Sequence, residues 1–120
     1  MKNRRKMTNY KSGHDAEDCS AQYLKSKGFK VLDQNWKTPR CEIDIVAEKG
    51  DTVYFVEVKY RKTSLQGSGL EYITPKKITQ MQFAAECWIG ANKYTGEYEL
   101  SAIEVSGSAY QITAFLPNIL

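Results

Sequence analysis

The clearest pattern in the chain is the alternation of apolar and polar residues between Glu42 and Lys59. Such alternation is typical of β-strands, because successive side chains of a strand point to opposite faces of a sheet. Gly50 and Asp51 interrupt the pattern and can form a two-residue hairpin turn. The stretch therefore predicts an antiparallel hairpin that is paired outward from this turn, beginning with Lys49 opposite Thr52 and continuing residue by residue.

The rest of the chain predicts two helices and three more strands. The first helix is expected over Asp15–Lys27, with Gly28 as its stop. The second has Thr74 at the N-cap, Pro75 in its first turn and Gly90 at its end, and apolar residues at spacings of three and four give it a buried face. The further strands are Phe29–Trp36, Tyr98–Val105 and Tyr110–Phe115. The order α-β-β-β-α-β-β predicts an α/β fold, a mixed sheet flanked by helices.

Length and charge indicate how many domains the chain forms and which kind of partner it could bind. The 120 residues fit a single domain over residues 12–120. Residues 1–11 carry Lys2, Arg4, Arg5, Lys6 and Lys11, and we expect a basic flexible arm there. Such an arm suits nucleic acid, although a merely solvated leader explains it equally well.

Two further features bear on compartment and on metal sites. No apolar run is as long as a membrane span and no secretory signal is visible, so we expect a cytoplasmic protein with no membrane partner. The three cysteines are widely spaced, as Cys19, Cys41 and Cys87. This spacing indicates reduced thiols rather than a zinc site or a disulfide framework.

The predicted hairpin gathers acidic residues. Its register places Asp44 opposite Glu57 and Glu42 opposite Lys59, with opposed Cβ atoms about 5 Å apart. Two facing carboxylates repel each other unless a cation lies between them or one is protonated. A hard divalent ion such as Mg²⁺ or Mn²⁺ fits this surplus charge, with Lys59 beside it as a proton-handling amine. A solvated polar face is the alternative, although the apolar content of both strands leaves few positions for one.

These residues also resemble a family pattern. Asp44, twelve intervening residues and then Glu57-Val58-Lys59 are similar to the core motif of the PD-(D/E)XK nuclease superfamily, which has the restriction-endonuclease-like fold. The wider context resembles the YraN-like family of small endonuclease-like proteins, whose fold is similar to that of archaeal Holliday-junction resolvases. The motifs that carry this resemblance are Gly13-His14-Asp15-Ala16-Glu17, Tyr23-Leu24, Gly28-Phe29, Asn35, Glu42-Ile43-Asp44, Phe55-Val56-Glu57-Val58-Lys59-Tyr60-Arg61, Gly67 and Thr74-Pro75-Lys76-Lys77.

The chain departs from that family at two places. Cys41 stands where the family usually has glycine before Glu-Ile-Asp, and Tyr98-Glu99-Leu100-Ser101 replaces an Arg-Phe-Asp motif. Neither change removes an expected metal ligand.

The resemblance implies a metal-dependent endonuclease that hydrolyses nucleic-acid phosphodiesters, most readily those of DNA. Asp44 and Glu57 would hold Mg²⁺ or Mn²⁺ together with the backbone carbonyl of Val58. Lys59 would orient or deprotonate the attacking water, or stabilise developing charge. Glu17 matches the acidic residue of the family's first helix and would join the metal's water shell or a second ion.

Three basic residues are candidates for phosphate contacts, namely Arg61, Lys76 and Lys77. The two lysines fall in the first turn of a helix, where the helix dipole disfavours cations, so anion binding is the more attractive reason for them. Two rival functions stay open: a non-catalytic nucleic-acid-binding module with the same fold, and a structural subunit that self-associates through its tyrosine-rich sheet edge. A homodimer would suit symmetrical junction cutting, but nothing in the sequence demands it.

Overall fold

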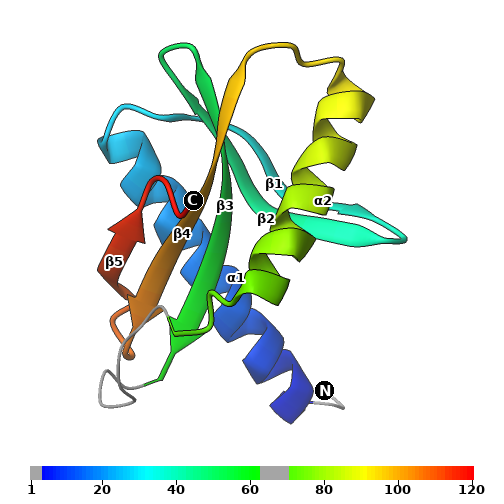
Figure 1. Cartoon of the computed structure of the whole chain (residues 1–120). Helices are drawn as coiled ribbons and strands as arrows, with labels where there is room; N and C mark the ends of the chain where they lie inside the picture. Colours follow the sequence, from blue (N-terminus) through cyan, green and yellow to red (C-terminus); the bar gives the residue numbers. More distant parts are fainter. Residues whose placement is uncertain (1–3, 63–70) are drawn as a thin grey trace.

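The computed structural model describes residues 4–62 and 71–120, with side chains from residue 13 onward. Its seven elements confirm the predicted order α-β-β-β-α-β-β. In chain order they are α1 (Arg4–Ser26), β1 (Lys30–Thr38), β2 (Cys41–Lys49), β3 (Thr52–Arg61), α2 (Pro75–Asn92), β4 (Glu97–Ser106) and β5 (Gln111–Leu116), as shown in Figure 1.

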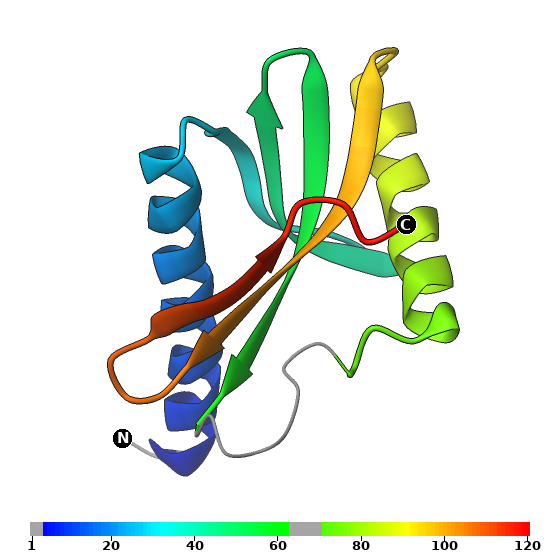
Figure 2. The same cartoon turned by 60° about the vertical axis from the view of Figure 1, so that its left-hand side comes forward.

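The strands form one mixed sheet in the order β1-β2-β3-β4-β5. Neighbouring strands are antiparallel except β3 and β4, which are parallel because α2 carries the chain back across the sheet between them. Figures 1 and 2 show α1 and α2 on opposite faces of this sheet. The central strands are therefore covered on both sides, as the predicted mixed sheet with flanking helices requires.

Each helix packs on its own apolar cluster. The cluster under α1 consists of Ala16, Ala21, Leu24, Phe29, Ile45, Ala47, Val56, Ile103 and Val105. The cluster under α2 consists of Ile43, Val46, Val53, Phe55, Met81, Ala84, Ala85, Trp88 and Leu100. Because both faces of the central strands are buried, a carboxylate on β2, β3 or β4 is stable only with a hydrogen-bond donor, a cation or a proton beside it.

The first helix is longer than its sequence pattern predicts. We expected it to begin at Asp15, but α1 begins at Arg4 and so includes most of the segment 1–11 that was expected to be a flexible arm. The helix places Ala16, Ser20 and Leu24 against the sheet at spacings of four. Packing of this face stabilises the helix from Ala16 onward. The polar composition before Asp15 gave no apolar periodicity from which the earlier start could be predicted.

The second helix begins as predicted and ends later. The Thr74 hydroxyl accepts a hydrogen bond from the backbone N–H of Lys77 at 3.1 Å, and Pro75 stands at the first helical position. Gly90 does not stop the helix. The C-cap of α2 is Lys93, which has a left-handed φ of 54°. No helix in the described part of the chain is long and apolar enough to span a bilayer.

The central hairpin confirms the predicted turn and only part of the predicted register. Lys49 pairs with Thr52, as expected, and the ladder between β2 and β3 ends at the pair Ile45–Val56. The next expected pairs, Asp44 with Glu57 and Glu42 with Lys59, do not form. Beyond Ile45 the first half of β2 pairs only with β1, and beyond Val56 the second half of β3 pairs only with β4. The hairpin therefore opens at its acidic end.

Candidate active site

The opening between β2 and β3 follows from a change in backbone direction at Asp44. Ile45 belongs to the apolar cluster under α1, whereas Ile43 belongs to the cluster under α2. In a regular strand, residues two apart share a face, so the alternation is broken at Asp44. Opposite it on β1, Asn35 has a left-handed φ of 56°, and the register skips this pair. β1 and β2 are therefore irregular at the same pair of residues. This irregularity directs the Asp44 side chain into the gap between β2 and β3.

Asp44 lies deepest in the gap and binds the backbone of β3. Its Oδ2 accepts a hydrogen bond from the backbone N–H of Val58 at 2.8 Å, a group that the open ladder leaves without a partner on β2. Burial and then the nearby carboxylate of Glu57 raise the pKa of Asp44 to about 8, and the Val58 hydrogen bond, which favours the ionised form, offsets only part of this rise. Without a cation, Asp44 is therefore mostly protonated at neutral pH.

Glu17 approaches the same gap from α1. Its Oε1 is buried and has no hydrogen-bond donor among the described residues. Burial raises the pKa of Glu17, and its carboxyl group is close enough to Asp44 for a proton on one to hydrogen-bond the other. The structure thus brings together Asp44, Glu57 and Glu17, three acidic residues that are far apart in the sequence.

Glu57 is on the α2 side of the gap and is paired with a lysine. The Nζ of Lys77 lies 2.9 Å from Glu57 Oε2, and the two side chains are 31% and 21% exposed. Lys77 comes from the first turn of α2, where the helix dipole disfavours a cation, so its position is explained by the acidic cluster. Lys76, its neighbour in the chain, is exposed.

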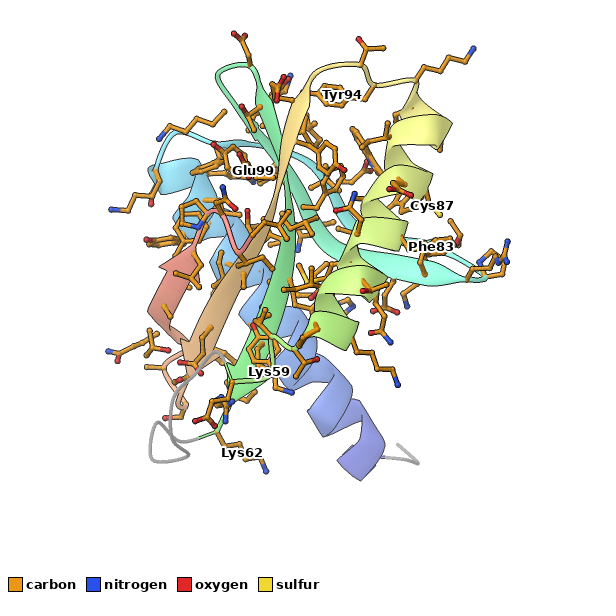
Figure 3. The ribbon with its side chains drawn as sticks, in the orientation of Figure 1. Lys59, Lys62, Phe83, Cys87, Tyr94 and Glu99 are labelled. Atoms are coloured by element: carbon orange, nitrogen blue, oxygen red, sulfur yellow. The ribbon has the colours of Figure 1, made fainter. Side chains whose placement is uncertain are left out.

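Lys59 is on β3 two residues after Glu57 and lies near an aromatic ring rather than near Glu42. Its Nζ lies 5.6 Å from the ring centre of Tyr72, a cation–π arrangement. The Tyr72 hydroxyl is buried, without a hydrogen-bond partner among the described residues. Burial and then the Glu57 carboxylate raise its pKa. Figure 3 labels Lys59 on the lower half of β3.

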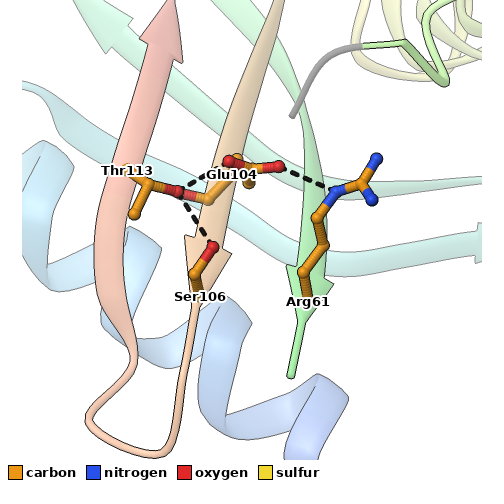
Figure 4. Close-up of polar contacts among 4 residues, drawn as sticks. All are labelled: Arg61, Glu104, Ser106 and Thr113. Carbon is orange, nitrogen blue, oxygen red and sulfur yellow. Dashed lines mark hydrogen bonds and ion pairs between the residues drawn. The ribbon is translucent and has the colours of Figure 1, made fainter. Parts of the chain in front are cut away.

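Arg61 takes part in a polar network that the sequence did not reveal. Its Nε lies 2.8 Å from Glu104 Oε2 on β4, and Glu104 Oε1 accepts a 2.7 Å hydrogen bond from the Thr113 hydroxyl on β5 (Figure 4). Glu104 is only 6% exposed. A single glutamate inside the otherwise small and apolar strand Leu100–Val105 was the available signal, since a buried carboxylate needs a cation.

A groove runs beside the acidic cluster on the α2 side. It encloses about 480 Å³ between the start of β2, β3 and the first turns of α2. Glu42, Glu57 and Lys77 supply its polar wall, and Met81, Phe83 and Ala84 supply an apolar one. The groove has the size of a small-molecule or nucleotide subsite.

The cluster has the oxygen ligands of a hard-cation site, but in this structure they are not arranged as one. Among residues 13–62 and 71–120, no three histidine, cysteine, aspartate or glutamate side chains are arranged to hold a metal ion. Instead, Lys77 supplies the positive charge at Glu57 and a proton supplies it at Asp44. Both carboxylates are oxygen ligands of the kind that Mg²⁺ and Mn²⁺ prefer. Asp44 and Glu57 are therefore the two residues of this cluster that could hold such an ion.

Comparisons with known proteins identify relatives over most of the chain. Residues 16–109 match the model of a family described as "Uncharacterised protein family UPF0102". A UPF0102 protein of Vibrio campbellii is 35% identical over 103 residues, which cover 83% of this chain and 84% of that protein. A UPF0102 protein of Neisseria meningitidis serogroup C is 35% identical over 101 residues, covering 83% and 88%. One of Syntrophomonas wolfei is 46% identical over 69 residues, covering 58% and 60%.

The matched region begins at Ala16 and so contains all three acidic residues, Lys59, and both lysines of the first turn of α2. The chain therefore belongs to the UPF0102 family, the YraN-like family whose motifs its sequence resembles.

Proposed function

We propose that this protein is a metal-dependent endonuclease of the PD-(D/E)XK superfamily that hydrolyses phosphodiester bonds, most readily in DNA. One observation carries the proposal: Asp44 lies in an opening between two strands, its pKa is raised to about 8, and no lysine or arginine of the described side chains forms an ion pair with it. Perturbed titration of this kind is typical of functional sites rather than of packing. A buried carboxyl group that is uncharged in the folded protein forms no ion pair that would stabilise the sheet, so packing alone does not explain it.

The acidic residues would hold Mg²⁺ or Mn²⁺. Asp44 and Glu57 would be direct ligands with the backbone carbonyl of Val58, and Glu17 would bind the outer water shell. A bound divalent ion supplies Lewis-acid chemistry, neutralising phosphate charge and lowering the pKa of a water molecule. The hydrogen bond from the Val58 N–H fixes the orientation of the Asp44 carboxylate, so that ligand would change little when the ion binds.

Lysines would act on the attacking water and on the phosphate charge that the metal ion does not neutralise. Lys59 extends from the same strand as Glu57, and the Tyr72 ring limits where its ammonium group can move. It would orient or deprotonate the attacking water, or stabilise charge that develops on the phosphate. Lys77, once released from Glu57 by a divalent ion, would be free to contact a phosphate. This exchange would couple metal binding to substrate binding.

Nucleic acid would bind along the groove beside α2. Lys76 is exposed in the first turn of α2 and is a candidate for a backbone contact. Arg61, two residues after Lys59 on β3, is a further candidate through the charge of its guanidinium group, which is also ion-paired with Glu104. These contacts are independent of base sequence, so we expect shape-dependent and salt-dependent binding.

A cleavage assay tests the proposal. Wild-type protein is incubated with Mg²⁺, Mn²⁺ or EDTA and with duplex, flap, single-stranded and four-way-junction DNA, next to Asp44→Asn and Lys59→Met. Matched controls are Asp51→Asn in the hairpin turn and Lys30→Met at the start of β1, which change the same residue types at exposed positions away from the acidic cluster. We expect metal-dependent cutting by the wild type and both controls, and a loss of at least about 100-fold in the two site variants.

Two outcomes contradict the enzymatic proposal. If all variants cut equally, the activity belongs to a contaminant. If nothing is cut but the wild type binds DNA with a steep salt dependence, the protein is the non-catalytic binding module that the sequence left open.

A further inference from the structure

Two cysteines meet where α2 packs against the start of β2. Cys41 is the first residue of β2 and packs against the apolar cluster under α2. Cys87 is on α2, one helical turn after Phe83, and the Arg40 guanidinium lies 5.9 Å from the centre of the Phe83 ring. Figure 3 shows Phe83 and Cys87 on the side of α2 that faces the projecting end of β1 and β2. The helix and the strand end therefore bring the segments that carry the two cysteines side by side.

The thiols themselves interact. Burial raises the pKa of Cys87, and the neighbouring Cys41 thiol is the next largest cause. Both cysteines are free and half-buried, so a small molecule can reach them. The Cys41 sulfur also lies 3.3 Å from the Thr38 hydroxyl, which holds this side chain in a defined orientation. The third cysteine, Cys19, is on α1, on the opposite face of the sheet.

We propose that Cys41 and Cys87 form a reversible disulfide bond. The pair joins two elements that are distant in sequence, and Cys41 lines the groove together with Glu57 and Lys77. Oxidation would therefore tie together the two walls of that groove. The inference concerns a modification site and does not depend on the proposed nuclease function, since it rests on the thiol pair alone.

A low-molecular-weight disulfide such as oxidised glutathione is the oxidant. One cysteine loses its proton to solvent, and its thiolate attacks the small disulfide, forming a mixed disulfide and releasing one small thiolate. The second cysteine then loses its proton and attacks the protein sulfur of the mixed disulfide. This attack forms the Cys41–Cys87 bond and releases the second small thiolate. Two electrons pass from the protein to the small disulfide, which leaves as two thiols.

Two properties of the reaction follow from the structure. Because burial raises the pKa of Cys87, little thiolate is present at neutral pH, and oxidation should speed up several-fold per pH unit between about pH 7 and pH 9. The bond would close a long loop that contains the whole opening between β2 and β3. We therefore expect the oxidised protein to melt at a temperature higher by at least several degrees.

The test uses full-length protein equilibrated with oxidised and reduced glutathione, then alkylated and digested without reduction. We expect the wild type and Cys19→Ser to yield a linked peptide pair containing Cys41 and Cys87, in a monomeric product whose mass falls by two hydrogens and returns with dithiothreitol. Cys41→Ser and Cys87→Ser should yield only mixed disulfides with glutathione. Thermal melting of each reduced variant checks that it is folded.

Three results overturn the proposal. The first is a linked pair that includes Cys19 instead of either partner. The second is a crosslinked dimer as the main oxidised product. The third is full alkylation of both Cys41 and Cys87 in the wild type at every glutathione ratio, a readout that needs no variant to fold.

Discussion

Replacing Asp44 by asparagine should stabilise the metal-free protein at alkaline pH while it removes the proposed metal ligand. Asparagine has nearly the same shape, and its side-chain oxygen can still accept the hydrogen bond from Val58. It cannot ionise, so it relieves the repulsion that the buried carboxylate meets. We therefore expect stability and activity to change in opposite directions at this position.

The magnitude follows from the pKa of Asp44. Its ordinary value is 3.8 and its value in the folded protein is about 8. Between these two values the folded state binds more protons than the unfolded state, so the free energy of unfolding falls as pH rises through this window. The difference of about 4 pH units corresponds to a ceiling of about 6 kcal/mol. Because the same repulsion also acts on Glu57 and Glu17, we expect a net loss of about 2–4 kcal/mol for the wild type.

Urea unfolding in EDTA between pH 4.5 and pH 8.5 measures the effect. Wild type and Asp44→Asn should have similar midpoints at the acidic end, and the variant should become progressively more stable than the wild type as pH rises. Asp51→Asn, which changes an exposed carboxylate in the hairpin turn, should follow the wild type. A gap between wild type and Asp44→Asn that is constant across pH would refute the reasoning. So would a wild type that becomes relatively more stable toward pH 8.

Two further predictions concern the lysine and glutamate partners of the site. Lys77→Met should destabilise the metal-free protein by about 1 kcal/mol, because the partly buried carboxylate of Glu57 loses its cation, while Lys76→Met at the exposed neighbouring position should change stability by less than about 0.5 kcal/mol. Equal effects of the two substitutions in denaturant titrations would contradict the assigned ion pair. Glu104→Leu should cost about 3–5 kcal/mol, since it removes the carboxylate that balances the largely buried guanidinium group of Arg61, and the double variant Glu104→Leu/Arg61→Met should recover much of that loss. A double-mutant cycle with no coupling energy would show that the two side chains are not partners.

Local patterns in the sequence predicted much of the fold. Alternation, the Gly50-Asp51 turn and the Thr74-Pro75 helix start each reflect interactions within a few residues, and all three are present in the structure. The errors fell at helix ends and in the register of the hairpin. α1 begins at Arg4, α2 extends to Asn92 before a left-handed cap, and the hairpin ladder ends at Ile45–Val56, none of which local composition encodes.

The candidate site was predicted in part, because Asp44 and Glu57 directly follow the regular part of the hairpin and so lie near each other even though they do not pair. The sequence singled out Asp44, Glu57 and Lys59 as close neighbours, and it added Glu17 only through a family resemblance. It did not predict that Lys77 would pair with Glu57. That contact joins α2 to β3, and its formation depends on how the helix crosses the sheet.

The sequence by itself determined which residues form the hairpin and where it turns, since turn chemistry and alternation are local. The tertiary structure decided where the hairpin stops. The alternation of β2 breaks at Asp44, opposite the left-handed Asn35 of β1, and the ladder between β2 and β3 ends at Ile45–Val56. The separation of the two strands leaves the Val58 N–H to Asp44 and creates the opening in which the carboxylates meet.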